Sequence, residues 1–410
     1  MEIRHLIQRL KETKVLENYS FMTALSILSA LIGLVIYPFV IRATGKDAYG
    51  TYVYALTIAS IFQVIFDYGF DSPCAKAIVQ ARHDVHALSR IVSTVLVLKM
   101  AIVMFCSIVF AACLYVVPFM HHNIALCVIT FVQLVAMSLF PTWYFQGLKK
   151  MRLVTYINLS LRLATIPLII WLIRSPQDIF FYALIVMFSV VSGTFVAYVC
   201  LLSDGIRWQR ISMESAKKLM RDATPFFATS LTCSLKMLSV KVIIKNMFGV
   251  GEVAIYDFAE KLVTIPRFFT QNINAALFPE VVDNAPLTRV KRILRYERMI
   301  GIGFVALIAL LSYPAVLILG GQEMMDAVSV TIILSSSIYT WLVAGAYINF
   351  IFIPANRYYL ITINQIIALV SCLILMVAGV LVWKSVNVVA LGLVLSGYIE
   401  VLFCRYMSKK

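Results

Sequence analysis

Long apolar stretches separated by short polar segments run along the whole chain. A helix needs about 20 consecutive apolar residues to cross a bilayer. This pattern predicts twelve membrane-spanning helices, with connecting segments too short to hold a soluble domain. The predicted spans are 19–41, 50–70, 91–117, 124–145, 154–173, 179–202, 222–248, 253–278, 298–318, 327–352, 359–382 and 387–406. The sequence therefore predicts an all-α integral membrane protein.

The segment before the first span, residues 2–14, has apolar residues at helical spacing. They are Ile3, Leu6, Ile7 and Leu10, with Arg4, Arg9 and Lys11 between them. This arrangement is typical of a short amphipathic helix that lies on the membrane surface. A frayed tail is the alternative interpretation.

The distribution of Lys and Arg predicts the orientation of the spans. Cytoplasmic loops of membrane proteins carry an excess of these residues. With the N-terminus inside, 24 of the 35 cations fall on the cytoplasmic side, and only Arg42, Lys46, Arg174 and Lys384 fall in outer loops. Both termini are therefore predicted to be cytoplasmic.

The chain repeats a short pattern at half its length. Residues 45–55 read GKDAYGTYVYA and residues 249–259 read GVGEVAIYDFA, and both fit G-x4-[GA]-x-Y-x-x-A. Each copy lies at the outer turn between the first two spans of its half. A weaker echo pairs 156–158 with 362–364 at the fifth span of each half. The sequence thus predicts two six-helix bundles, 1–205 and 206–410, as parallel repeats around a central cavity.

Composition supports the membrane assignment and excludes other classes. The chain is 61% hydrophobic and 13% charged, whereas soluble domains carry about 25% charged residues. The net charge of +15 would suggest nucleic acid for a soluble protein, but here the cations follow the topology, so no nucleic-acid partner is predicted. The eight cysteines form no C-x-x-C pair and the histidines are too few, so we expect no metal site.

Eleven charged residues fall inside the predicted spans, where each Lys, Arg or Asp near the bilayer centre costs roughly 2.5–3.5 kcal/mol on insertion scales. Such residues are usually functional. The cations are Lys99, Arg162, Lys236, Lys241, Lys245, Lys261 and Arg267, and the anions are Asp67, Asp257, Glu260 and Glu400.

The eighth span has the strongest polar stripe. At 100° per residue its polar side chains fall within about 120° of one face. They are Asp257, Glu260, Lys261, Thr264, Arg267 and Gln271. Asp257 and Lys261 are an i, i+4 pair that can neutralise each other. An amphipathic helix on the membrane surface is the alternative, but it would break both the charge asymmetry and the repeat.

Charges on other spans are expected to differ in their roles. On the seventh span, Lys241 is the expected partner of the eighth, whereas Lys236 is expected to face elsewhere and Lys245 to extend to the outer surface. On the fifth span, Thr155, Asn158, Arg162 and Thr165 form a second polar stripe. Lys99 is expected to reach the cytoplasmic surface, and Asp67 and Glu400 to pair with basic loops.

The balance of the charges within the spans indicates the charge of the transported molecule. Seven cations and four anions leave a surplus of three positive charges. Surplus cations in a cavity of low dielectric attract an anion. Lys and Arg both suit a phosphate, and Arg can hold it through two bonds.

Three local motifs support a family resemblance over nearly the whole chain. They are the turn at 45–52 (GKDAYGTY), residues 66–70 (FDYGF) closing the second span, and residues 141–147 (PTWYFQG) running into Lys150 and Met151. With twelve spans in about 400 residues, the chain resembles the Wzx-type O-antigen flippases of the multidrug/oligosaccharidyl-lipid/polysaccharide exporter superfamily.

This resemblance implies a flippase for an undecaprenyl-pyrophosphate-linked oligosaccharide in the bacterial inner membrane, working by alternating access. It implies that Arg162, Lys241, Lys261 and Arg267 bind the pyrophosphate. Asp257 or Glu260 would couple transport to a proton or sodium gradient. It implies no cofactor, and as partners membrane lipid together with the polysaccharide polymerase and chain-length machinery.

Other functions fit the sequence less well. A drug or cation antiporter of the same superfamily would favour an acidic cavity. A membrane-bound polymerase or glycosyltransferase would need a large outer loop or a clustered catalytic motif, and the sequence has neither. We therefore expect no enzymatic activity. A channel remains an alternative, although two similar halves favour alternating access.

Overall fold

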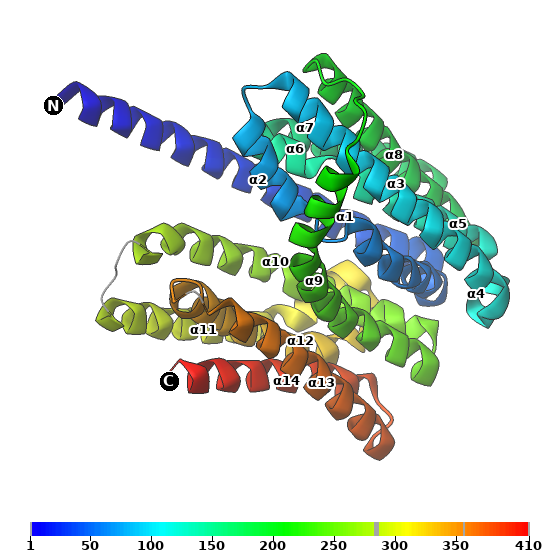
Figure 1. Cartoon of the computed structure of the whole chain (residues 1–410). Helices are drawn as coiled ribbons and strands as arrows, with labels where there is room; N and C mark the ends of the chain where they lie inside the picture. Colours follow the sequence, from blue (N-terminus) through cyan, green and yellow to red (C-terminus); the bar gives the residue numbers. More distant parts are fainter. Residues whose placement is uncertain (1, 283–286, 356, 409–410) are drawn as a thin grey trace.

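The protein is a multi-pass helical membrane protein, seen here in a computed structural model (Figure 1). The structure describes the backbone of residues 2–282, 287–355 and 357–408, and side chains at 32–33, 36–264, 266–267, 292–355, 357 and 359–408. Within these ranges every regular element is a helix. Ten segments are long and apolar enough to cross a membrane.

The first half of the chain holds nine of the described elements. They are α1 (Glu2–Asp67), α2 (Asp71–Ala81), α3 (Val85–Val116), α4 (Pro118–His122), α5 (Ile124–Leu139), α6 (Thr142–Gly147), α7 (Met151–Leu172), the 3₁₀ turn η1 (Pro176–Asp178) and α8 (Ile179–Ser203).

The second half of the chain begins with α9. Its elements are α9 (Met213–Phe248), α10 (Val250–Val282), α11 (Leu287–Gly320), the 3₁₀ turn η2 (Gln322–Met324), α12 (Ala327–Tyr347), the π-helical turn η3 (Ile348–Phe352), α13 (Tyr358–Val382) and α14 (Val386–Met407). Figure 1 shows α3, α5, α7 and α8 in one group, α11 to α14 in another, and α1, α9 and α10 where the groups meet.

The two predicted repeat turns contain glycines in the same unusual conformation. Gly45 interrupts α1 with φ 78°, and Gly249 separates α9 from α10 with φ 102°. A positive φ is easily reached only by glycine. Counting α1 as two helices on either side of Gly45, the described residues hold twelve long helices, the number predicted. The matching turns are consistent with the two-repeat layout.

Several segments predicted as loops are helical. The segment 71–90 contains α2, and most of 279–298 belongs to α11, which begins at Leu287. The segment 2–14 is helical, but it is continuous with the first span rather than a separate element. Sequence reasoning missed the helices in 71–90 and 279–298 because it searched for long apolar stretches, and these two segments carry many charges. The position of 2–14 relative to the membrane surface stays a prediction.

The two halves pack tightly at the repeat turns. A side-chain carbon at Gly50 would lie 1.9 Å from the carbonyl oxygen of Val250, and one at Gly251 would lie 2.4 Å from Oδ1 of Asp47. The largest core cluster continues across this contact, from Tyr49 and Val53 to Ile255. The predicted boundary at residue 205 precedes a non-helical segment, 206–212. The division into two bundles stays a prediction, because α9 also contacts the first half: Tyr68 stacks on Phe227 with ring centroids 4.7 Å apart.

Candidate functional site

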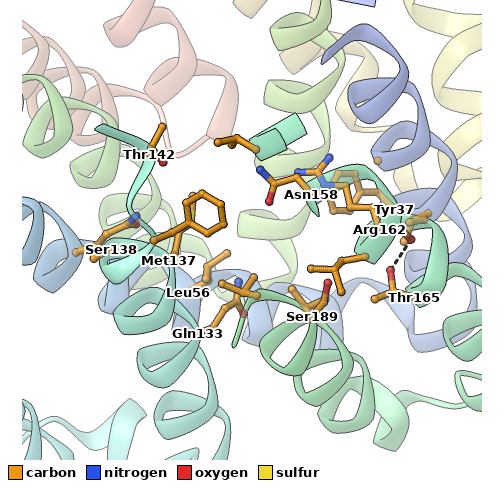
Figure 2. A pocket seen from close by; sticks show the side chains of 18 of the residues that line it. Tyr37, Leu56, Gln133, Met137, Ser138, Thr142, Asn158, Arg162, Thr165 and Ser189 are labelled. Atoms are coloured by element: carbon orange, nitrogen blue, oxygen red, sulfur yellow. Dashed lines mark hydrogen bonds between the residues drawn. The ribbon is translucent and has the colours of Figure 1, made fainter. Parts of the chain in front are cut away.

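A cavity of about 930 Å³ lies among α1, α5, α7, α8 and α10 (Figure 2). Its size is within the range of pockets that enclose small organic ligands. Its walls are mixed in character. The polar side chains that line it include Gln63, Gln133, Thr155, Asn158, Arg162, Thr165, Ser189, Asp257, Lys261 and Thr264, and aromatic lining comes from Tyr37, Tyr52 and Tyr182.

The polar stripe predicted on the fifth span forms one wall of this cavity. Thr155, Asn158, Arg162 and Thr165 all line it from α7. Figure 2 shows Asn158 and Arg162 directed toward the pocket, with Tyr37 of α1 beside Arg162. The prediction of a polar face with an arginine near its middle is confirmed. Helical spacing alone was sufficient here because α7 has one clear polar edge.

The stripe predicted on the eighth span divides between two surfaces. Asp257, Lys261 and Thr264 of α10 line the cavity, whereas Glu260 and Arg267 are not among its lining residues. The division follows the helical angles, because the first three lie within about 60° on one side of the stripe and the other two lie at its opposite edge. Gln271, the last member of the predicted stripe, lies outside the described side chains.

Asp257 is the centre of a cluster of charged side chains that also contains Lys241, Glu260 and Lys261. It is 5% exposed, and its carboxylate contacts two lysines: Oδ1 lies 2.7 Å from Nζ of Lys241, and Oδ2 binds Nζ of Lys261. The hydroxyl of Tyr49 donates a third hydrogen bond, 3.0 Å long, to Oδ2. A buried carboxylate is stable only when it is paired and hydrogen-bonded. These three contacts therefore hold Asp257 as an anion and fix the helices around it.

Lys241 is enclosed by carboxylates on α10. Besides Asp257, its Nζ lies 3.0 Å from Oε2 of Glu260. The predicted pairing of the seventh span with the polar stripe is thus confirmed. However, Lys241 does not line the cavity in this conformation, because two acidic side chains hold its ammonium group behind the wall.

Lys261 faces the first half of the chain as well as the cavity. Its ammonium group donates a hydrogen bond to the hydroxyl of Tyr49 and lies 3.6 Å from the ring centroid of Tyr37. A cation over an aromatic face is attracted by the ring electrons. Lys261 is therefore a cation of the second half held by two tyrosines of the first.

Arg267 points toward α12. Its guanidinium donates a hydrogen bond to the hydroxyl of Ser337. Of the four cations predicted to bind pyrophosphate, the structure thus places Arg162 and Lys261 on the cavity wall, and Lys241 and Arg267 outside it. That all four bind the pyrophosphate stays a prediction.

Two further ion pairs correct the expectations for single charges. Lys99 does not reach the surface: it is buried, 3.3 Å from Oδ1 of Asp67, and donates a 2.5 Å bond to the carbonyl of Ser138. Lys236 pairs with Glu400 at 2.5 Å across α9 and α14. Asp67 and Glu400 therefore have partners within the spans rather than in basic loops. Burying a lone charge costs far more than burying a pair, which is why these residues meet.

The remaining in-span cation, Lys245, lies near aromatic rings. Its Nζ is 5.4 Å from the ring centroid of Tyr54 and 5.5 Å from that of Phe119. Each of the four in-span carboxylates already contacts a lysine. None of these four carboxylates is therefore left to neutralise the surplus of three positive charges predicted from the sequence.

Sequence reasoning missed the neutral part of the site. Gln63 of α1 and Gln133 of α5 line the cavity, yet neither belongs to a polar stripe. One signal was present. The sequence of α5 contains no charged residue, and Gln133 is its only residue with a side-chain amide. An isolated amide in an apolar span is costly unless it has a partner. The tyrosines of the site carried no such signal, since aromatic residues are ordinary core residues.

The sequence was then compared with known proteins. The family described as "Polysaccharide biosynthesis protein" matches residues 15–284. The chain belongs to this family.

Two curated relatives carry the name "Putative O-antigen transporter". The protein of Escherichia coli (strain K12) is 22% identical over 270 residues, which cover 65% of this chain and 65% of that protein. The protein of Shigella dysenteriae is 21% identical over 263 residues, 61% of this chain and 63% of that protein. The chain thus matches slightly less than two thirds of the length of each relative.

Solved structures share the fold at low sequence identity. The lipid II flippase MurJ in an inward closed conformation superposes with a TM-score of 0.73 and 10% identity, covering 95% of this chain and 87% of that chain. An inward-facing multidrug resistance MATE family transporter of the MOP superfamily gives 0.67 and 14%, covering 93% and 94%. The fold is therefore that of these transporters.

Proposed function

We propose that this protein is a flippase for an undecaprenyl-pyrophosphate-linked oligosaccharide, the repeat unit of O-antigen or another surface polysaccharide. It moves this lipid from the cytoplasmic to the periplasmic leaflet of the bacterial inner membrane by alternating access. The observation that carries the proposal is a cavity with cations from both halves of the chain on its wall: Lys99 and Arg162 of the first half and Lys261 of the second. Family membership and the transporter fold support it.

The proposed roles follow from the position of each charge. Arg162 and Lys261 bind the pyrophosphate, because each offers N–H donors to the cavity and the group to be bound is a polyanion. Lys241 and Arg267 act from behind the wall in this conformation: Lys241 holds Asp257 and Glu260 in place, and Arg267 ties α10 to α12.

Coupling to an ion gradient is assigned to Asp257 or Glu260. Asp257 contacts both halves of the chain through Tyr49 and the two lysines. A proton or sodium ion that reached this carboxylate would compete with the lysines for it. Such competition would link ion entry to separation of the halves. The protein itself carries out no covalent chemistry.

The surroundings of the protein follow from the same proposal. Both termini are cytoplasmic, since this orientation puts 24 of the 35 Lys and Arg residues on the cytoplasmic side, as is usual for membrane proteins. The polysaccharide polymerase and the chain-length machinery use the lipid after it has crossed, so they are the proposed protein partners.

Deletion of the gene in a strain with no second flippase tests the function. We expect loss of surface polysaccharide, with lipid-linked repeat units retained on the cytoplasmic side, and restoration by the wild-type gene. Normal surface polysaccharide in the deletion strain would contradict the proposal.

Complementation with variants tests the site. Arg162→Gln should fail to restore export although it is present in the membrane. Arg152→Gln is the matched control, because it removes a cation from the same helix, α7. The side chain of Arg152 is exposed and does not line the cavity. Equal export by both variants would exclude Arg162 as a pyrophosphate ligand.

A further inference from the structure

Gln133 is a buried amide on the cavity wall that has an unused acceptor. It lies on α5 and is 7% exposed, and its Oε1 has no hydrogen-bond partner in the protein. It nevertheless lines the cavity, and Figure 2 shows it on the side opposite Asn158 and Arg162. The unpartnered atom therefore belongs to a side chain that borders a space large enough for a ligand.

An acceptor in this position needs a donor from outside the chain. Buried polar atoms in native proteins are almost always hydrogen-bonded, and those that are not call for a specific explanation. On α5 itself, the hydroxyl of Thr130 donates to backbone carbonyls of its own helix, and the hydroxyl of Ser138 has no hydrogen-bond partner. The hydroxyl of Tyr52 on α1 hydrogen-bonds the same amide group, but Oε1 has no partner among the described residues, which leaves the cavity as the source of a donor to Oε1.

The chemistry of the acceptor excludes the phosphate part of the proposed substrate. An ionised pyrophosphate has acceptor oxygens only, so it repels a carbonyl oxygen. Sugars, in contrast, present hydroxyl and acetamido N–H donors. Gln also supplies an N–H₂ donor beside its oxygen, so one amide can engage two adjacent sugar groups.

We infer that Gln133 is a specificity-determining residue that binds the sugar nearest the pyrophosphate, and that the neutral polar wall around it is a glycan subsite. This inference rests on the proposed function. Gln63 of α1 and Ser189 of α8 line the same cavity and add neutral donors and acceptors. The subsite is therefore distinct in charge from the Arg162 and Lys261 side, which takes the pyrophosphate.

The division of the cavity has a consequence for selectivity. A site built to hydrogen-bond a hydroxyl rejects a ligand that lacks it, because the buried polar atom is then left unpaired. The wall around Gln133 accordingly makes the protein prefer a sugar-bearing lipid over the bare lipid pyrophosphate. A cationic site alone would bind both equally.

The experiment compares two lipids on the purified full-length protein in lipid nanodiscs. One probe is undecaprenyl pyrophosphate without sugar, and the other is the lipid-linked repeat unit extracted from cells that lack this gene. Binding is measured for the wild type and for Gln133→Met, which keeps the length of the side chain but removes the amide. The expected loss of affinity is about five- to tenfold for the sugar-bearing lipid, the value of one hydrogen bond, with no change for the bare lipid.

Gln365→Met is the matched control. Gln365 on α13 also has an unpartnered Oε1, but it does not line the cavity. Its replacement should leave the affinity for both lipids unchanged. Unaltered binding of the bare lipid to Gln133→Met shows that the variant is folded, and Gln133→Asn, which retracts the amide by one carbon, should give an intermediate loss for the sugar-bearing lipid.

The outcomes separate the inference from the proposed function. If the wild type binds neither lipid, the flippase proposal fails and the subsite fails with it. If the wild type binds both lipids equally, or if Gln133→Met binds the sugar-bearing lipid normally, the pyrophosphate site stands and the glycan subsite is wrong. In that case water satisfies the Gln133 acceptor.

Discussion

The hydroxyl of Tyr49 donates a 3.0 Å hydrogen bond to the carboxylate of Asp257, although 208 residues separate the two in the sequence. Tyr49 lies in the first repeat turn and Asp257 in the second, so this bond joins the two halves of the chain. Lys261 completes the contact, since it binds both residues. We call these three residues the latch. It lies one helical turn from Gly45, on the side predicted to face outward, and any opening of that side must break it.

The first prediction concerns the latch. Tyr49→Phe removes one hydrogen bond to a buried carboxylate, which typically costs about 1.5–3 kcal/mol. We expect a lower thermal unfolding midpoint in detergent and reduced export in cells. Tyr54→Phe is the control, because Tyr54 is buried on the same helix and has no hydrogen bond through its hydroxyl among the contacts described. A Tyr49→Phe variant as stable as that control would show that the latch does not hold the halves together.

The second prediction concerns the contact of the repeat turns. In Gly50→Ala the new methyl group would lie 1.9 Å from the carbonyl oxygen of Val250, and a backbone atom cannot move aside as a side chain can. The halves must separate locally, at a cost of about 1–3 kcal/mol. Thermal unfolding and export should both fall. Gly303→Ala on α11 meets no atom within 4 Å and should be neutral or slightly stabilising. Equal behaviour of the two variants would contradict the tight packing of the turns.

The third prediction concerns the ion pair between α9 and α14. Lys236→Met leaves the carboxylate of Glu400 buried without its partner, and such a change typically costs about 3–5 kcal/mol. The double variant Lys236→Met with Glu400→Leu should regain most of this loss, because no charge then stays buried. The stabilities are measured as a double-mutant cycle. Additive losses in the double variant would mean that the two residues act independently.

The fourth prediction concerns Glu297 of α11. This residue is 1% exposed, and neither carboxylate oxygen has a hydrogen-bond partner. Glu297→Met should therefore raise the free energy of unfolding by about 1–3 kcal/mol, the usual penalty of an unsatisfied buried polar group. The control Glu214→Met, at an exposed position of α9, should change stability little. A destabilised Glu297→Met would show that the carboxylate has a stabilising partner.

Glu297 also shows why some of the site could not be predicted. In the sequence it lies in the charged segment 279–298, which resembles a cytoplasmic loop. The structure instead makes it part of a packed helix beside α12. Burial of a side chain depends on which helix covers it, and a single sequence has no record of that neighbour. The same limit explains why Lys99 was expected at the cytoplasmic surface and Lys236 was expected away from the eighth span with no partner named, whereas both are found in ion pairs.

The sequence by itself determined the features that depend on local spacing. Apolar stretches of about 20 residues specified the spans, glycines specified the two repeat turns, and helical angles specified the polar faces of α7 and α10. Only the tertiary structure decided the partners: that Asp257 meets Tyr49, that Lys241 is held behind the wall, and that Gln133 borders the cavity. The reason is physical. Periodicity along one helix states which residues share a face, but the electrostatic and hydrogen-bonding energy of that face depends on residues hundreds of positions away.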